Sequence, residues 1–224
     1  MGYKEEFIEF MVESGVLTFG DFVTKSGRQT PYFINTGNYK MGAQAARLGD
    51  YYAACIQERA PEGLSCLFGP AYKGIPLAVT AAASLYRNYG RDVPYCFNRK
   101  EAKDHGEGGS LVGYQLQDGD TVAIIEDVVT AGTALRETLA LFDALGKRVT
   151  VSHLFVSVDR MERGQGEKAA LQEIQEEYGI QVCPLVTIRD IVAHLHGREI
   201  GGTVVLDDGR KAAIEGYLAR YGGR

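Results

Sequence analysis

Short, continuous apolar runs alternate along this chain with longer segments whose apolar residues recur every three or four positions. The clearest run, at residues 122–125, reads V-A-I-I and is rich in β-branched residues, which favours a strand buried on both faces of a parallel sheet. Residues 134–145 follow, with leucine and phenylalanine at the spacing of one helical face. We therefore expect a strand that ends at Glu126, a short loop, and then a helix.

The same two patterns predict the other elements of the chain. Strand-like runs cover residues 16–23, 29–35, 64–68, 94–98, 148–158, 182–186 and 203–206. Helical spacing covers residues 3–14, 43–60, 75–89, 167–178, 188–195 and 210–221. Together these patterns predict an α/β domain built on a mostly parallel sheet. The two runs on either side of K-S-G-R predict a small hairpin outside that sheet.

Composition narrows the class of protein. A chain of 224 residues with 45% hydrophobic content can form one domain with a sizeable core. The formal net charge of −5 argues against a general nucleic-acid-binding surface. No apolar run is long enough to span a membrane, and the N-terminal segment lacks an apolar signal core. We therefore expect a soluble, cytoplasmic protein that binds neither nucleic acid nor membrane.

The residues that most often bind metals show no metal-binding spacing. The four cysteines include no C-x-x-C pair, so neither a structural zinc site nor a redox motif is indicated. His194 and His196 are two positions apart, not the four of a helical metal pair, so we expect them to be surface residues.

Two carboxylates, Glu126 and Asp127, lie at the carboxyl end of this predicted strand, where an open α/β sheet places its ligands. The loop after them, T-A-G-T, opens the helix, so unpaired N–H groups and the positive end of the helix dipole can bind a phosphate. Gly132 allows close backbone approach, and Thr130 and Thr133 can donate hydroxyl hydrogen bonds. Glu126 and Asp127 can accept hydrogen bonds from sugar hydroxyls, so a phosphorylated ribose fits both halves. The alternative is an ordinary strand–turn–helix with a capping threonine.

Two further sites lie at the carboxyl ends of predicted strands. Residues 69–74 read G-P-A-Y-K-G, a tight turn that places Tyr72 and Lys73 on the ligand side of the sheet. A lysine there can balance a pyrophosphate, although a plain βα connection is the alternative. Arg160 follows the run at 148–158, and its guanidinium suits bidentate capture of a planar carboxylate.

Two other segments have both a functional and an ordinary interpretation. Phe33 and Ile34 could face a planar ring beside the cation Lys25, although an aromatic in a strand is usually core and a turn lysine is usually solvated. Residues 99–109 could form a lid that closes over a polyanion, or a solvated surface loop. The basic side chains of this segment are Arg99, Lys100, Lys103 and His105.

Four segments resemble one known family. E-D-V-V-T-A-G-T at residues 126–133 resembles the phosphoribosyl-pyrophosphate (PRPP) signature of type I phosphoribosyltransferases. Three segments resemble the hood, the turn and the catalytic loop of the orotate phosphoribosyltransferases: K-S-G-R-x-x-P-Y-F-I-N at 25–35, G-P-A-Y-K-G at 69–74 and R-K-E-A-K-D-H-G-E-G-G at 99–109. The four segments lie in the family's order. The family often has a phenylalanine where this chain has Ile34, which should alter base stacking slightly.

The resemblance implies a single domain with the doubly wound, mostly parallel sheet of type I phosphoribosyltransferases, in which residues 1–40 contribute a hood over the base site. It implies a pentosyltransferase of pyrimidine biosynthesis that joins N1 of orotate to C1′ of PRPP, giving orotidine 5′-monophosphate and pyrophosphate. It also implies Mg²⁺, bound mainly through PRPP, and a homodimer in which residues 99–109 act in the neighbouring subunit's site.

Family roles are transferred only to matching positions. The implied catalytic residues are Lys73, Arg99, Lys100, Lys103, His105 and Asp127. The implied PRPP-binding residues are Lys25, Tyr72, Lys73, Arg99, Lys100, Lys103, His105, Glu126, Asp127, Val128, Val129, Thr130, Ala131, Gly132, Thr133 and Ala134. The implied orotate-binding residues are Lys25, Phe33, Ile34, Thr130 and Arg160. Whether His105 protonates the departing pyrophosphate stays open.

Two other functions are compatible with part of these motifs. A purine phosphoribosyltransferase would share residues 126–133 but not the combination of Phe33 with the R-K-x-x-K-x-H loop. A PRPP-sensing transcriptional regulator would keep the signature, but it should carry a basic DNA-binding extension and no cationic loop. Neither G-x-S-x-G nor G-x-x-x-x-G-K-[ST] occurs, so hydrolase and P-loop functions have no motif support.

Overall fold

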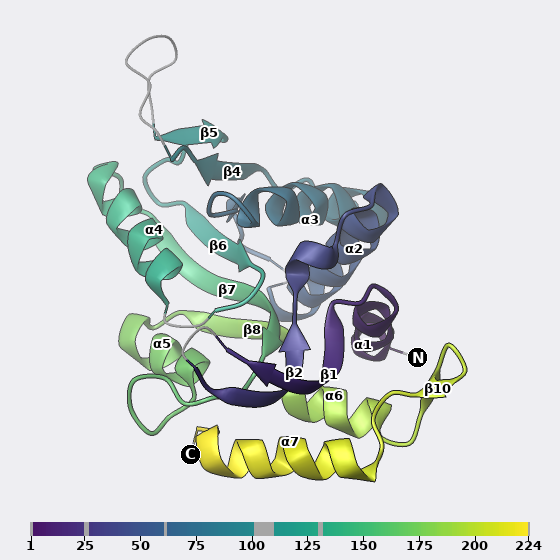
Figure 1. The fold of residues 1–224 in the computed structure, drawn as a ribbon. Helices are drawn as coiled ribbons and strands as arrows, with labels where there is room; N and C mark the ends of the chain where they lie inside the picture. The colour runs from purple at the N-terminus through teal and green to yellow at the C-terminus, as the bar shows by residue number, and fades with distance from the viewer. Residues whose placement is uncertain (1, 25–26, 61, 101–109, 130–131, 224) are drawn as a thin grey trace.

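The computed structural model describes residues 2–24, 27–60, 62–100, 110–129 and 132–223. Its centre is a six-stranded sheet in the order β5-β4-β3-β6-β7-β8 (Figure 1). The strands of this sheet are β3 (Cys66–Phe68), β4 (Tyr95–Asn98), β5 (Leu111–Gly113), β6 (Thr121–Glu126), β7 (Thr150–Asp159) and β8 (Gln181–Thr187). Neighbouring strands run parallel except β4 and β5, so β5 is an antiparallel edge strand. The predicted mostly parallel α/β sheet is confirmed.

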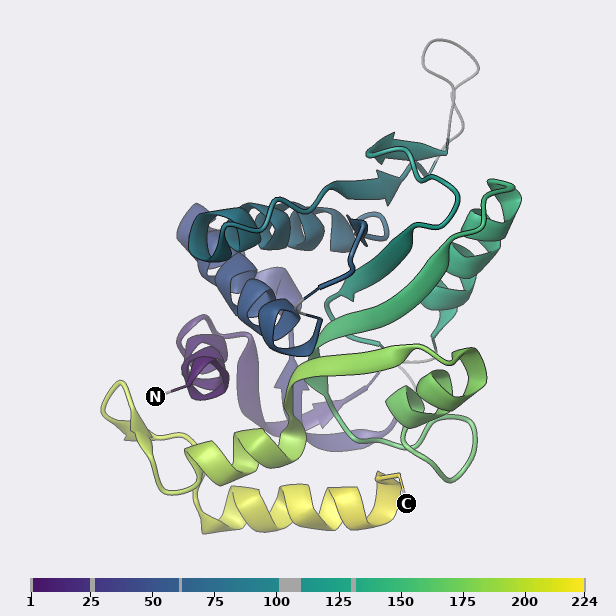
Figure 2. The ribbon, with the colours of Figure 1, turned by 180° about the vertical axis from the view of Figure 1, so that it is seen from behind.

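Helices cover both faces of this sheet. The α-helices of the described residues are α1 (Tyr3–Glu13), α2 (Gly42–Arg59), α3 (Gly74–Tyr89), α4 (Thr133–Ala144), α5 (Ala170–Tyr178), α6 (Ile188–Leu195) and α7 (Asp208–Tyr221). Val122 and Ile124 of β6 pack in a core with residues of α4 and α5. Ala123 and Ile125 face the opposite core, shared with α1, α2 and α3. Figures 1 and 2 show these two helical layers from opposite sides, and they explain why β6 is apolar on both faces.

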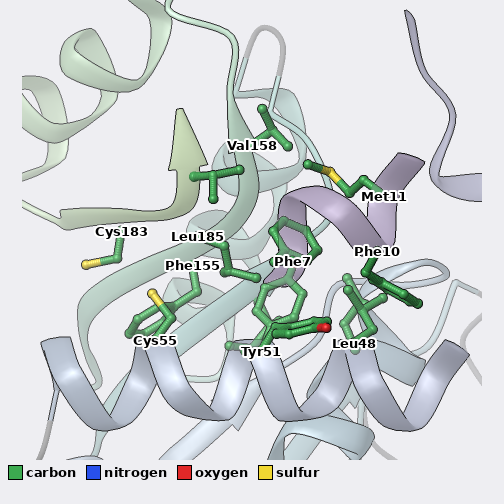
Figure 3. Close-up of a cluster of buried hydrophobic side chains, with 14 of the residues drawn as sticks. Phe7, Phe10, Met11, Leu48, Tyr51, Cys55, Phe155, Val158, Cys183 and Leu185 are labelled. Atoms are coloured by element: carbon green, nitrogen blue, oxygen red, sulfur yellow. The ribbon is translucent and has the colours of Figure 1, made fainter. Parts of the chain in front are cut away.

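The N-terminal segment forms an antiparallel hairpin of β1 (Leu17–Val23) and β2 (Gln29–Ile34), followed by the 3-10 helix η1 (Thr36–Asn38). We call residues 1–40 the hood. Phe7 and Phe10 of α1 pack against Tyr51 of α2 (Figure 3), so the hood shares the main core. On its other side β2 packs against α7. The hood is therefore fixed between the main core and the C-terminal helix.

The predicted helices and strands agree with the structure to within a few residues, but three short elements were not predicted. These are the 3-10 helix η1, the edge strand β5 and the short strand β9 (Glu199–Ile200), which pairs with β10 (Thr203–Val204). Runs of two or three residues carry too little pattern to identify a strand. No helix in the described part of the chain is both long and apolar enough to cross a membrane.

The prediction that His194 is a surface residue was wrong. Only 8% of its side chain is exposed, and its Nε2 lies 2.9 Å from Glu9 Oε1. This contact ties α6 to α1. His196 is exposed, as predicted, and its Nε2 lies 2.7 Å from Asp208 Oδ1.

Candidate active site

The carboxyl end of β6 carries the acidic pair Glu126 and Asp127. The hydroxyl of Tyr52, on α2, donates a hydrogen bond to the Glu126 carbonyl oxygen at 2.6 Å. Ser157, on β7, donates to the Asp127 carbonyl oxygen from its backbone N at 3.0 Å and from its Oγ at 2.5 Å. Because neighbouring elements hold both carbonyl groups, the two side chains start from fixed positions at the sheet edge.

The helix after this pair begins with a left-handed residue. Gly132 has a φ of 66°, a conformation that favours glycine, and a Cβ there would lie 3.2 Å from Ile174 of α5. Helix α4 starts at Thr133, so the amides of Thr133 and Ala134 have no acceptor within the helix. The strand–loop–helix arrangement predicted from the sequence is present, and its helix N-terminus can accept an anion.

The turn between β3 and α3 lies directly against the end of β6. A Cβ at Gly69 would lie 2.2 Å from the Gly74 carbonyl oxygen, and a Cβ at Gly74 would lie 2.9 Å from the Ile125 carbonyl oxygen. Side chains do not fit at these two positions. This close approach brings Lys73, the residue before α3, next to the acidic pair.

Lys73, Asp127 and Thr36 meet at this edge. Lys73 Nζ lies 2.8 Å from Asp127 Oδ2, and the Thr36 hydroxyl donates to the same oxygen at 2.7 Å. Lys73 Nζ also donates to Thr36 Oγ1 at 3.1 Å. The Lys73 side chain is 69% exposed, so this ion pair is weak enough for a ligand to replace it. Since Thr36 belongs to η1, the hood contributes directly to the site.

A cavity of about 240 Å³ opens beside these three residues, between η1, α2 and α3. Its wall is largely apolar, and the charged groups lie together within it, as is usual for a small-molecule site. The lining residues are Thr36, Gly37, Tyr39, Ala45, Leu48, Tyr52, Lys73, Pro76, Leu77, Thr80, Asp127 and Ser157.

Glu126 has different surroundings from Asp127. Only 8% of Glu126 is exposed, and its Oε1 is buried without a hydrogen-bond partner among the described residues. Burial and the nearby carboxylates of Asp127 and Glu137 raise the pKa of Glu126 to about 7. A buried acceptor without a donor is costly. Glu126 can therefore receive a hydrogen bond from a ligand hydroxyl.

Arg160 follows β7 and packs beneath the hood. The carbon of its guanidinium lies 4.7 Å from the ring centroid of Tyr32, on β2, and its Nε donates to Glu162 Oε1 at 2.8 Å. Successive side chains of a strand point to opposite faces, so Ile34 lies on the face of Tyr32 and Phe33 on the other. Phe33 is 38% exposed. Arg160 is thus on the Ile34 side of the hairpin.

Residues 36–185 match the phosphoribosyl transferase domain family. The chain is 56% identical over 220 residues to the orotate phosphoribosyltransferase of Lachnoclostridium phytofermentans, with 98% of this chain and 97% of the relative covered. It is 53% identical over 222 residues to the orotate phosphoribosyltransferase of Clostridium beijerinckii, with 99% of both chains covered. The chain belongs to the orotate phosphoribosyltransferase family.

Solved structures agree with this family assignment. The crystal structure of orotate phosphoribosyltransferase from Francisella tularensis has a TM-score of 0.84 at 34% identity and covers 97% of this chain and 100% of that chain. Adenine phosphoribosyltransferase from Saccharomyces cerevisiae has a TM-score of 0.51 at 14% identity, which shows only a shared fold. The fold alone therefore does not choose the base, and the choice must come from particular residues.

The family's cationic loop starts at the end of β4. The Arg99 amide donates to the Ser110 carbonyl oxygen at 2.8 Å, which holds the two flanks of the loop together. Arg99 Nε is buried and has no hydrogen-bond partner in the part of the chain described above. Lys100 and Tyr72 are both exposed. The Lys100 and Tyr72 side chains are therefore accessible for contact with a ligand or a second subunit.

The structure brings together only part of the predicted family site. Lys73, Glu126 and Asp127 lie at one edge, and the half-buried Val128 and Val129 lead from them toward α4. Five predicted site residues lie outside the described residues: Lys25, Lys103, His105, Thr130 and Ala131.

Sequence reasoning missed two residues that contact the predicted ones. Thr36 binds both Lys73 and Asp127, but a T-G-N turn carries no chemical signal by itself. Glu162 binds Arg160. Its position two residues after Arg160, in V-D-R-M-E-R-G, was the one available clue.

Proposed function

We propose that this protein transfers the phosphoribosyl group of PRPP to orotate, forming orotidine 5′-monophosphate and pyrophosphate in pyrimidine biosynthesis. The observation that carries this proposal is the ion pair of Lys73 with Asp127 at the end of β6, next to the buried, unpartnered Glu126. The near full-length similarity to orotate phosphoribosyltransferases supports it. We also propose a cytoplasmic location, because PRPP is too highly charged to cross a membrane unaided.

In this proposal PRPP replaces contacts that the free protein makes within itself. The 5′-phosphate binds at the N-terminus of α4, at Thr133 and Ala134. Ribose hydroxyls donate to the unpartnered Oε1 of Glu126 and to Asp127. Lys73 leaves Asp127 for the pyrophosphate, so the exchange keeps both charged groups paired.

Orotate binds under the hood in the same proposal. The Arg160 guanidinium pairs with the orotate carboxylate, and Ile34, on the same face of β2 as Tyr32, bounds the ring. Phe33 lies on the other face of β2, and its place in the base site rests on the family resemblance alone. Lys25 and Thr130 complete the base site on the strength of the family resemblance.

The chemistry calls for stabilisation of charge on the leaving group. N1 of orotate loses its proton to solvent and forms a bond to C1′ while the C1′–O bond to pyrophosphate breaks. Positive charge develops at C1′ and negative charge develops on pyrophosphate. Lys73 is placed to stabilise the pyrophosphate charge, and the other catalytic cations come from the 99–109 loop: Arg99, Lys100, Lys103 and His105.

We propose Mg²⁺ as the cofactor, held mainly by the substrate. No group of three or more acidic, histidine or cysteine side chains in the described ranges could hold a metal ion. Mg²⁺ often uses one or two carboxylates together with phosphate oxygens and water, and Glu126 and Asp127 fit that donor set. The bound ion would neutralise charge on the pyrophosphate.

We further propose a homodimer in which residues 99–109 serve the neighbouring subunit's site. Exposed tyrosines lie on the edge elements that precede this loop: Tyr95 is the first residue of β4, and Tyr86 and Tyr89 are near the end of α3, which packs against β4. Tyrosine is enriched at protein interfaces, and an exposed cluster of this kind suits a second copy of the chain.

A steady-state assay with PRPP, Mg²⁺ and a panel of bases tests the reaction. We expect one pyrophosphate released per nucleotide formed with orotate, and no turnover with adenine, guanine or hypoxanthine. Turnover with a purine would instead indicate a purine phosphoribosyltransferase. PRPP binding without turnover of any base would indicate a PRPP sensor.

A further inference from the structure

Glu162 collects hydrogen bonds from three parts of the chain. Its Oε1 accepts from Arg160 Nε at 2.8 Å, from the Tyr217 hydroxyl of α7 at 2.8 Å and from the Tyr32 hydroxyl of β2 at 3.4 Å. Its Oε2 lies 3.2 Å from Arg28 Nη1, just before β2. One carboxylate therefore joins the hood, the C-terminal helix and the end of β7.

Backbone contacts hold the same segment against the end of α7. The Arg163 amide donates to the Tyr221 carbonyl oxygen at 2.9 Å, and the Gly223 amide donates to the Met161 carbonyl oxygen at 2.9 Å. Tyr217 also packs edge-on against Tyr32, with ring centroids 6.1 Å apart. The position of Tyr217 relative to Glu162 is therefore fixed by the fold and not by the side chain alone.

This cluster has one negative charge too few. Two guanidinium groups, Arg28 and Arg160, share the single carboxylate of Glu162, and no second carboxylate forms an ion pair with either in the described part of the chain. Burial raises the pKa of Tyr32 and Tyr217, so both remain neutral donors. A ligand carboxylate would balance the net charge of about +1 on this half-buried cluster.

Among the described residues, Arg160 contacts Glu162 through one carboxylate oxygen, Oε1, and is not held in a bidentate pair. Its Nη2 lies 2.6 Å from Glu162 Oε1 but is not aligned for a hydrogen bond, and it is buried. Because Tyr217 and Tyr32 donate to the same oxygen, they limit how far Glu162 can turn toward the guanidinium. Without them, Glu162 could form a bidentate pair that competes with a ligand for Arg160.

We propose that Glu162 and Tyr217 position Arg160 for the carboxylate of orotate, so that the C-terminal helix α7 takes part in recognising the base. This inference rests on the proposed role of Arg160. It assigns a function to α7, a segment in which no chemistry was predicted from the sequence.

The test compares Tyr217→Phe with Tyr221→Phe. The first change removes the hydroxyl that binds Glu162. The second removes the hydroxyl of Tyr221, a residue of the same helix whose ring packs near Tyr217, and this hydroxyl has no hydrogen-bond partner among the described residues. We expect Tyr217→Phe to raise the KM for orotate about three- to tenfold, with the KM for PRPP unchanged. Tyr221→Phe should change neither KM. Thermal unfolding of each variant checks that the fold is retained.

Arg160→Ala and the double variant Arg160→Ala/Tyr217→Phe separate the binding role of Arg160 from the positioning role of Tyr217. If Tyr217 acts through Arg160, Tyr217→Phe should add nothing in the Arg160→Ala background. If Arg160→Ala leaves the orotate KM unchanged, the proposed binding role of Arg160 is wrong. If Arg160→Ala raises that KM but Tyr217→Phe does not, or raises both KM values equally, the positioning role of Tyr217 is wrong while the role of Arg160 stands.

Discussion

Glu126 and Asp127 are adjacent in the sequence, but the fold gives their carboxylates opposite surroundings. Asp127 has a lysine and a hydroxyl within hydrogen-bond distance, whereas Glu126 is buried with an oxygen that has no donor in the described structure. The difference follows from the alternation of side chains in an extended segment: Glu126, the last residue of β6, and Asp127, the next residue, point to opposite sides. The Asp127 carboxylate is therefore already paired, whereas the ionised form of Glu126 is unfavourable unless a ligand donates a hydrogen bond to it.

The buried carboxyl makes stability depend on pH. The pKa of Glu126 is about 7 in the fold against 4.5 for the exposed group, so its favourable contribution is complete below pH 4.5 and is lost as the pH rises through 7. Glutamine does not titrate. The stability of the native protein relative to Glu126→Gln should therefore fall by up to about 3 kcal/mol between pH 4.5 and pH 8.

Urea unfolding of both proteins at pH 5 and pH 8, at equal protein concentration, measures this change. A stability difference that is the same at both pH values would show that Glu126 is already ionised in the fold at pH 5.

At this scale the sequence could identify residues whose neighbours in the chain are informative. Glu126 and Asp127 follow an apolar run, and Lys73 lies in a glycine-bounded turn, so both could be predicted. Thr36 could not, because it meets Asp127 across 91 positions of sequence. Tyr217 and Glu162 are 55 positions apart, and nothing local in either segment indicates the contact.

At the scale of elements, the turn between β3 and α3 decides where Lys73 lies. Its two glycines allow the chain to pass close to itself and to the end of β6. The G-P-A-Y-K-G pattern predicted this tight turn, because proline fixes its own φ angle and glycine permits backbone conformations and close approaches that other residues do not. The sheet order could not be predicted from pattern alone, because strand pairing joins segments that are distant in sequence.

Gly74→Ala should disturb both stability and PRPP binding. The added Cβ would lie 2.7 Å from Pro70 Cδ, 2.8 Å from the Gly69 carbonyl carbon and 2.9 Å from the Ile125 carbonyl oxygen, none of which is a flexible side-chain end. We expect a loss of about 1–3 kcal/mol in the free energy of unfolding. The KM for PRPP should rise because Lys73 moves relative to Asp127.

Gly42→Ala is the matched control. Gly42 is the first residue of α2, as Gly74 is of α3, but a Cβ there meets nothing within 4 Å. Urea unfolding and PRPP kinetics of the two variants should differ clearly. Equal stability of both would mean that the turn tolerates a side chain and does not position Lys73 by close packing.

For the whole molecule, the net charge of −5 conceals a local concentration of basic residues. The basic segment that begins at Arg99 follows β4, an element near the edge of the sheet whose first residue, Tyr95, is exposed. Sequence resemblance alone indicated that this loop serves a second subunit, because neither composition nor periodicity carries information on assembly. The dimer therefore needs a test in which the two halves of a site come from different chains.

Two inactive variants should restore activity when their subunits mix. Lys103→Ala removes a loop cation, whose position lies outside the described residues, and should lower kcat by about 10²–10³ as a charge-stabilising donor is lost. Asp127→Asn removes the acidic partner of Lys73 at the sheet edge. If the loop acts in the neighbouring site, each heterodimer contains one site with intact Asp127 and intact Lys103, and one site with both defects. Random pairing of equal amounts should then recover about a quarter of native activity, by the two-fold symmetry of the dimer. A mixture in which heterodimers form, as shown by native mass spectrometry, but activity does not return would place the loop in its own subunit's site or outside catalysis.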